Sequence, residues 1–490
     1  MNLLRRLVPS LLAAALPAQI PVPLHQQADI PFLYRRRLEL EQLATARLSA
    51  DLLDMMRELP DLYSGGRPSP DVKTCGEALA EARARLLHVA RDADARVRES
   101  LFLFAYPELA DPDVHAALSL TVKELWGVAP AGAAQVRFRL RDAAGAICAE
   151  LPFPLAVGLE ELASFRVHVQ IPLAGLADGR YTGEARVTIG GRPPRASDPL
   201  PCGTLVVRRG AQARLQTLAR ARAQLDATAD AARRGSVELA SLDAVLAELQ
   251  RAVDLGQPYC FATALDLELA EAERRLQCLQ EGLPMFVGQH GVLRLGVRGD
   301  GNQVFPFLVF VPATRPGQEL PVAVLVPEAG GHEEAFFALH GRGDLLTRAE
   351  AAGVLLVATR SLSLAPMPDV MPRVLAAVRS AFPAARGKVT GFGHGAGAAQ
   401  LVFDARRDPA RYQRLFLLGM GWLAKDNVQA LPDTELRVVL SSLSPHQEAW
   451  AGLPEMLAQS GHKAASVEVA DGIPLALLPG RWLARLFEAR

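Results

Sequence analysis

The sequence is short of several features that would point to a function directly. It has five cysteines in 490 residues and none of them forms a CxxC pair, which argues against a zinc site. Lysine plus arginine equals aspartate plus glutamate, at 53 each. With no net charge and no basic block, an electrostatic nucleic-acid binder is not expected. After the N-terminus, no apolar run reaches the roughly 20 residues that span a bilayer.

What is present points to a packed, multidomain protein. Half of the residues are hydrophobic and 22% are charged, a balance that excludes wholesale disorder. At roughly 150 residues per domain, the length predicts about three domains.

The first residues follow the pattern of a secretory signal. Arg5 and Arg6 precede an apolar run from Leu7 to Leu16, and small residues continue to Ala18. We therefore expect residues 1–18 to be a signal peptide and the mature chain to be periplasmic or secreted, with no transmembrane segment. A membrane anchor or a misassigned start is the alternative interpretation.

Export would permit disulfides. Cys148 with Cys202, or Cys260 with Cys278, could then pair. Unpaired cysteines acting as small buried hydrophobes are the alternative.

The spacing of apolar residues changes along the chain and divides it into regions. Three- and four-residue steps predict a helical region over 19–112, with helices between 30 and 105. Alternation of apolar and polar residues predicts a small antiparallel β-sandwich over 113–208, which we interpret as a spacer or interaction module. Helical spacing returns over 209–282 as a hairpin or bundle, which needs partners for its apolar faces. The N-terminal helices are the nearest candidates, and a coiled-coil dimer is the competing one.

Residues 283–490 alternate between strand and helix patterns. Near-continuous apolar runs such as Val322–Val326 and Val354–Val357 are typical of central parallel strands that are covered on both faces. We predict a doubly wound α/β domain. The expected strands are 290–297, 303–312, 320–326, 353–358, 387–391, 413–419, 435–441 and 466–470.

Three stretches of this domain resemble secreted α/β-hydrolases of the esterase, polyhydroxybutyrate-depolymerase and prolyl-oligopeptidase-like branch. Residues 307–312 (FLVFVP) resemble the strand that opens such domains. Residues 321–337 (PVAVLVPEAGGHEEAFF) resemble their strand and oxyanion loop, and residues 389–398 (VTGFGHGAGA) lie where a GxSxG nucleophile elbow belongs. The order and spacing of the stretches agree with the family, so the resemblance implies an α/β-hydrolase fold over about 200 residues.

The nucleophile elbow has no nucleophile in this sequence. The small residues that let the turn close are taken as Gly391 and Gly395, which places Gly393 at the central position and His394 at the variable one. Glycine adopts the positive φ of such a turn without strain but has no oxygen with which to attack. We therefore expect no catalytic residue at the elbow.

The other positions that the resemblance implies are altered too. No Asp follows the strand at 436–440, the loop at 470–475 has no His, and Pro327 and Glu328 replace the His-Gly that opens the oxyanion loop. Backbone N–H groups at 329–331 could still face a ligand. The candidates for a degenerate binding site are Ala329, Gly330, Gly331, His332, Gly391, Gly393, His394 and Gly395.

Other chemistries find less support. Ser361 and Ser363 follow a strand but lack the small neighbours of an elbow, so we interpret them as loop hydroxyls. His332 and His394 are expected near each other at the carboxyl edge of the sheet, yet no carboxylate completes a metal site. Residues 391–396 partly match a dinucleotide fingerprint, but the next strand does not end in an acidic residue. We expect neither a metal nor a cofactor.

The sequence therefore predicts an exported pseudoenzyme: an α/β-hydrolase-fold protein without serine-hydrolase catalysis that acts in binding or assembly. Its ligand or protein partner is not identified. The alternative is an active carboxylester or peptide hydrolase with a non-standard catalytic constellation. A third hypothesis is an envelope scaffold that forms a homodimer through its helices.

Overall fold

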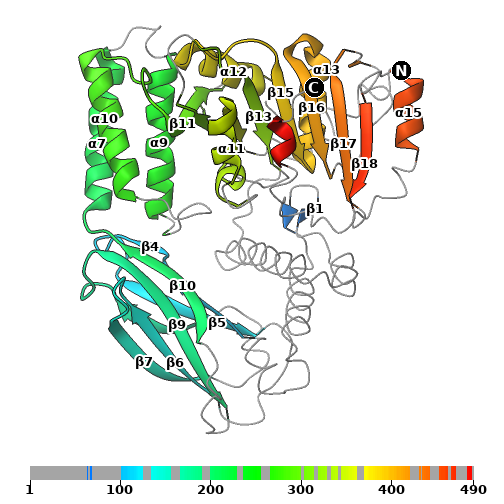
Figure 1. The fold of residues 1–490 in the computed structure, drawn as a ribbon. Coiled ribbons are helices and arrows are strands. Elements are labelled where there is room, and N and C mark those ends of the chain that lie inside the picture. Colours follow the sequence, from blue (N-terminus) through cyan, green and yellow to red (C-terminus); the bar gives the residue numbers. More distant parts are fainter. Residues whose placement is uncertain are drawn as a thin grey trace, which may run out of the picture.

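A computed structural model shows a β-sandwich, a group of helices and an α/β region (Figure 1). The structure describes residues 63–64, 67–68, 101–124, 134–155, 166–189, 199–228, 235–254, 256, 265–299, 303–313, 318–327, 333–339, 344–360, 369–419, 430–431, 433–441, 452–461, 465–470 and 483–487. The expected signal peptide and nearly all of the expected N-terminal helical region lie outside these residues. Within that region, β1 (Tyr63–Ser64) and β2 (Arg67–Pro68) pair as a short antiparallel ladder.

Two sheets form the sandwich because apolar residues alternate along their strands and face a common core. One sheet has the order β3-β5-β8 and the other the order β4-β10-β9-β6-β7. Val136, Phe138 and Leu140 of one sheet share a core with Leu118 and Leu120 of the other. The strands are β3 (Leu101–Tyr106), β4 (Leu109–Ala110), β5 (Ala117–Glu124), β6 (Ala134–Arg141), β7 (Ile147–Leu155), β8 (Arg166–Pro172), β9 (Gly179–Ile189) and β10 (Leu200–Val207).

The prediction of helix up to residue 105 is wrong at its end. Residues 101–106 form strand β3, paired antiparallel with β5, and β4 follows within the predicted helical region 19–112. The sandwich therefore begins at least 12 residues before the predicted boundary at 113. A short apolar run such as LFLFAY fits either period. Its aromatic residues favour a strand, and pairing with β5 satisfies its backbone groups.

Three amphipathic helices follow the sandwich. They are α7 (Ala211–Thr228), α9 (Val237–Asp254) and α10 (Leu265–Glu281). Their apolar faces pack on one another and join the same hydrophobic cluster as the α/β sheet. Helix α9 comes closest, since a Cβ built on Gly296 in the sheet would lie 2.4 Å from the Ala240 carbonyl oxygen. These helices thus find a partner in the sheet, which the sequence analysis did not consider.

The C-terminal region is built on a mixed sheet of eight strands with the order β11-β12-β14-β13-β15-β16-β17-β18. The first three in that order pair antiparallel, and from β14 onward all neighbours are parallel. Every strand expected in this region is present. They are β11 (Gly291–Arg298), β12 (Val304–Val311), β13 (Val322–Val326), β14 (Leu355–Thr359), β15 (Val389–His394), β16 (Tyr412–Leu418), β17 (Glu435–Ser441) and β18 (Ala465–Ala470).

Helices cover both faces of this sheet, which confirms the predicted doubly wound arrangement in the described residues. Helices α9, α12 (Val370–Ala381), α13 (Ala396–Arg407) and α15 (Leu453–Gln459) contribute to the larger cluster on one face. The π-helix η2 (Ala335–Leu339), α11 (Asp344–Ala352) and the 3₁₀ turn η7 (Arg485–Phe487) contribute to a second cluster. The short 3₁₀ turn η5 (Pro409–Arg411) leads into β16.

The cysteines correct one expectation. Cys148 is exposed, Cys202 and Cys278 are buried, and none of the three forms a disulfide. Neither predicted disulfide is therefore formed, while the alternative of buried cysteines outside disulfides holds for Cys202 and Cys278. Burial raises the pKa of the Cys202 thiol well above its usual value, so it stays protonated and inert.

No helix within the described residues combines the length and hydropathy needed to cross a membrane.

Candidate functional site

A tight turn joins β15 to α13. Gly395 stands between them with φ 54° and ψ −120°, a conformation that L-residues other than glycine rarely adopt. The Gly395 N–H donates to the Leu418 carbonyl at 2.8 Å, and its own carbonyl accepts from the Ala398 N–H at 3.1 Å. These bonds hold a strand-to-helix turn of the kind that presents a nucleophile in hydrolases.

The apex of this turn lies at Gly395 and not at Gly393, where the sequence analysis placed it. Gly393 is inside strand β15, paired with Leu417 and Val326 in register, and is not among the glycines with positive φ. The motif is therefore Gly393-His394-Gly395-Ala396-Gly397, shifted by two residues. The error arose because a run of alternating glycines fits the motif in two registers. Glycine occupies the apex in both.

Close backbone approaches explain the glycines on either side of the apex. A Cβ on Gly393 would lie 2.4 Å from the Ala398 Cα, and one on Gly397 would lie 2.2 Å from the Val326 carbonyl oxygen. Both neighbours are backbone atoms, which cannot rotate away. The turn thus keeps the small residues that it needs two positions before and two positions after Gly395.

Only some of the remaining predicted site residues lie within the described part of the chain. Gly391 and His394 are buried in β15. Ala329, Gly330, Gly331 and His332 lie outside the described residues, so their predicted approach to His394 stays a prediction. The same holds for Ser361, Ser363 and the loops after β17 and β18. Among the residues that the structure does describe, no group of three His, Cys, Asp or Glu is arranged to hold a metal ion.

A second feature, a buried charge network, was missed by the sequence analysis. Glu333 follows β13, is fully buried, and accepts from two arginines. Arg294 of β11 donates to it at 2.8 Å, and Arg360, just after β14, donates to it at 2.7 and 3.0 Å. A buried carboxylate needs such charge-assisted bonds to offset its desolvation.

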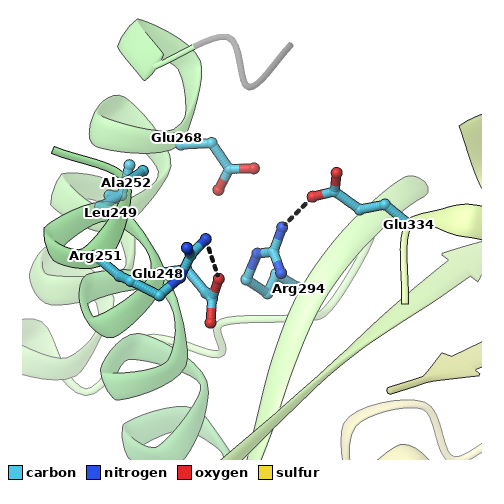
Figure 2. A pocket seen from close by; sticks show the side chains of 7 residues that line it. All are labelled: Glu248, Leu249, Arg251, Ala252, Glu268, Arg294 and Glu334. Carbon is cyan, nitrogen blue, oxygen red and sulfur yellow. Dashed lines mark hydrogen bonds and ion pairs between the residues drawn. The ribbon is translucent and has the colours of Figure 1, made fainter. Parts of the chain in front are cut away.

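Helices α9 and α10 add further charges to this network. Glu248 of α9 accepts from Arg360 at 2.6 Å and from Arg251 at 3.3 Å. Glu334 accepts from Arg294 at 2.7 Å. Glu268 of α10 points toward the same space (Figure 2). A small pocket there is lined by Glu248, Leu249, Arg251, Ala252, Glu268, Arg294 and Glu334.

One carboxyl of the network is poised near neutral pH. The pKa of Glu334 is raised to about 7, mainly by burial. The neighbouring Glu333 and Glu268 also raise it, and Arg294 opposes the rise. Burial alone would lower the pKa of Arg360, yet Glu333 and Glu248 raise it above its usual value. Glu334 can therefore gain or lose a proton near pH 7 while the arginine stays charged.

Arg294 of the network lies away from the elbow. In register across the sheet, Arg294 faces Leu308, which faces Ala358, then Leu325, then Phe392 of β15. These four steps between neighbouring strands correspond to about 19 Å. Arg360 lies nearer, because it directly follows β14, which is two strands from β15. The network can exchange a proton, and it fastens the segment after β13 to β11 and α9.

A sequence signal for the network did exist. Arg294 interrupts an apolar strand, and Glu333-Glu334 and Arg360 follow two buried strands at their carboxyl ends. Charges in such positions are seldom buried unless they pair with one another. No spacing rule, however, joins residues separated by 39 and 27 positions.

Comparisons with known proteins give a likeness of fold. No family model and no curated protein matches the sequence. Among solved structures, FphF, a fluorophosphonate-binding serine hydrolase of Staphylococcus aureus, is 10% identical with a TM-score of 0.34, over 41% of this chain and 98% of that one. A carboxyl esterase of Bacillus coagulans is 10% identical with a TM-score of 0.31, over 38% and 91%. An IroE-like serine hydrolase of Shewanella oneidensis is 12% identical with a TM-score of 0.33, over 40% and 80%.

Each of these likenesses covers about two fifths of this chain. At these identities and scores, the likeness says nothing about what the present chain binds or converts.

Proposed function

We propose that this chain is an α/β-hydrolase-fold protein that has lost serine-hydrolase catalysis and acts in binding or assembly. The observation that carries the proposal is Gly395. It stands at the positive-φ apex of a turn whose flanking glycines are still required by backbone contacts. Selection for a nucleophile would place Ser or Cys at that position, in spite of the strain.

The sequence outside the described residues supports the same proposal. The segment after 436–440, where the resemblance implies an acid, has no Asp, and its Glu448 is expected in the next helix. The segment at 470–475, where the resemblance implies a histidine, has no His. Triad members act as a unit, so removal of any one already costs most of the rate. Loss of all three leaves a fold that can hold a partner but cannot form an acyl intermediate.

A fluorophosphonate probe tests the catalytic half. The purified wild-type chain is expected to show no covalent label by intact mass. The Gly395→Ser variant should carry no more label than Gly395→Ala, which is its matched control at the same strained position. A label on any residue of the wild-type C-terminal region would overturn the proposal. Labelling restored by Gly395→Ser alone would show that an activating base is still in place, and would contradict the loss of the other triad members but not that of the nucleophile.

Export belongs to the proposal as well. It is supported by the charged start, apolar run and small residues of 1–18. Intact mass of the chain recovered from its native cells should show an N-terminus near residue 19. An uncleaved chain in the cytoplasm would contradict export without touching the elbow.

A further inference from the structure

The outward face of the five-stranded sheet carries a concentration of arginine. Buried and outward residues alternate along β6 and β9, so that Val136, Phe138 and Leu140 enter the core while the residues between them face outward. We call the outward set the arginine face. Its arginines are Arg137, Arg139 and Arg141 of β6 and Arg180 and Arg186 of β9.

The acidic residues on this face do not neutralise it. Glu150 is shared between Arg139 at 3.1 Å and Arg137 at 3.4 Å. Glu184 pairs with Arg141 at 2.8 Å. Within the described part of the chain, Arg180 and Arg186 make no hydrogen bond or ion pair. Five guanidinium groups against two carboxylates leave a formal charge of +3, on a protein whose whole formal charge is zero.

Two of these arginines face each other directly. Arg137 and Arg186 are Cα partners in the β6–β9 ladder, and both are exposed. Like charges in directly opposite positions destabilise a sheet. An anion bound between the two guanidinium groups would remove that repulsion, and the planar guanidinium suits a carboxylate in particular.

One edge of the same sheet carries prolines that disfavour a partner strand. β7 is the edge strand, and Pro152 and Pro154 lie in it opposite Arg137 and Gln135. Proline has no N–H, so the edge lacks donors at these two positions, a recognised defence against strand addition. Strand addition at these two positions of β7 is therefore disfavoured.

The chemistry of the face selects among anions. Its side chains on β6 and β9 are arginine, glutamine, threonine and glutamate, without an aromatic ring on which a base could stack. Among the described residues, Ile147 at the start of β7 is the large exposed apolar side chain that borders the face, which offers little to insert into a lipid surface. Arginines on alternate residues of β6 repeat at about 6.8 Å, the repeat of side chains on one side of an extended peptide.

We propose that the arginine face is a docking surface for an extended acidic peptide segment of a partner protein, centred on Arg137 and Arg186. Carboxylates on alternate residues of the partner meet the exposed guanidinium groups. The surface contains no residue of the elbow or of the buried charge network, so the proposal stands or falls separately from the loss of catalysis.

Fluorescence anisotropy with a labelled 12-residue peptide of alternating Glu and Ser tests this surface on the full chain. The wild type should bind the peptide at low salt and lose affinity as salt rises. The double variant Arg137→Gln/Arg186→Gln should bind at least about tenfold more weakly. The matched control is Arg214→Gln/Arg348→Gln, which removes the same charge from exposed helical ion pairs and should change affinity less than about twofold.

Both double variants should keep the wild-type circular dichroism spectrum, since every substituted arginine is exposed. Peptide affinity that is equal in the face variant and the control variant would overturn the proposal. So would binding of phosphatidylglycerol vesicles or of a 12-nucleotide single strand through Arg137 and Arg186 when the peptide does not bind.

Discussion

At the scale of single residues, the buried charge network shows how pairing makes burial tolerable. Arg294 and Glu333 are buried side chains, and each has more than one opposite charge within reach. Glu334, which pairs with Arg294, is the carboxyl of the network whose pKa burial raises to about 7.

The raised pKa of Glu334 predicts a stability that falls as pH rises. The folded chain holds a proton on Glu334 up to about pH 7, whereas the unfolded chain releases it near 4.5. Between these values the folded state binds more protons, so the free energy of unfolding decreases with pH. From pH 5 to 8 the wild type should lose on the order of 1–3 kcal/mol relative to Glu334→Gln, as measured by urea unfolding.

The matched control is Glu273→Gln, which removes a carboxylate from an exposed pair with Arg214 and should keep the wild-type slope. A Glu334→Gln variant with the same pH slope as the wild type would show that Glu334 does not titrate in this window.

At the scale of elements, the turn between β15 and α13 depends on glycine for two different reasons. Gly395 needs its backbone conformation, whereas Gly397 needs space, because β13 ends against it. Gly397→Ala would push a Cβ into the Val326 and Pro327 carbonyl oxygens, 2.2 and 2.4 Å away. We expect a loss of about 2–4 kcal/mol in unfolding free energy. Gly175→Ala, where no atom lies within 4 Å of the new Cβ, should stay near the wild-type value in the same thermal melt.

Helix α9 and strand β11 meet at another glycine. Ser241 Oγ accepts from the Gly296 N–H at 3.1 Å, and buried Arg275 of α10 donates to the carbonyl oxygens of Ser241 and Arg294. A Cβ on Gly296 would lie 2.4 Å from the Ala240 carbonyl oxygen and 2.8 Å from the Ala244 Cβ. Gly296→Ala should therefore separate α9 from the sheet and cost about 2–4 kcal/mol.

Hydrogen exchange distinguishes this local effect from general damage. Amides of α9 should exchange faster in Gly296→Ala, while those of the sandwich strands keep their rates. Unchanged protection along α9 would mean that the helix does not rest on β11 as closely as the structure places it.

The elements of the sheet were predictable, and their partners were not. Runs such as Val322–Val326 are long, apolar and bounded by turn residues, so period and composition agree on strand. The run LFLFAY fits both the helical and the strand period, and its pairing with β5 is what makes it a strand. The register of the elbow glycines, the packing of α9 on β11 and the bond between Arg294 and Glu333 are all set by contacts between distant segments, which no local pattern encodes.

At the scale of the whole molecule, the predicted boundary at 282/283 does not separate two cores. Leu242 and Val245 of α9 and Leu276 of α10 belong to one hydrophobic cluster with Leu295 and Val324 of the sheet. The sandwich keeps a core of its own. It meets the helices through β4, where Leu109 joins the larger cluster and the Leu109 N–H donates to the Gly256 carbonyl at 2.9 Å.

Asp111 ties the two bodies together across this junction. It follows β4, is almost fully buried, and its carboxylate accepts from the Gly210 and Gln212 N–H groups at 3.2 and 2.8 Å. These are N–H groups at the start of α7, which have no partner within the helix. A carboxylate there also complements the positive end of the helix dipole. One residue of the sandwich thus caps a helix that follows it by 99 positions.

Asp111→Ala should uncouple the sandwich from the helices without unfolding either. Three backbone donors, the N–H groups of Asp113, Gly210 and Gln212, lose a charged acceptor. This loss predicts a cost of about 1–3 kcal/mol and faster hydrogen exchange at residues 210–214. Asp142→Ala is the matched control, because Asp142 accepts from the Ala144 and Ala146 N–H groups within an exposed turn of the sandwich and should leave α7 unaffected. Equal exchange at residues 210–214 in the two variants would mean that the junction depends on the apolar contact of Leu109 and not on the cap.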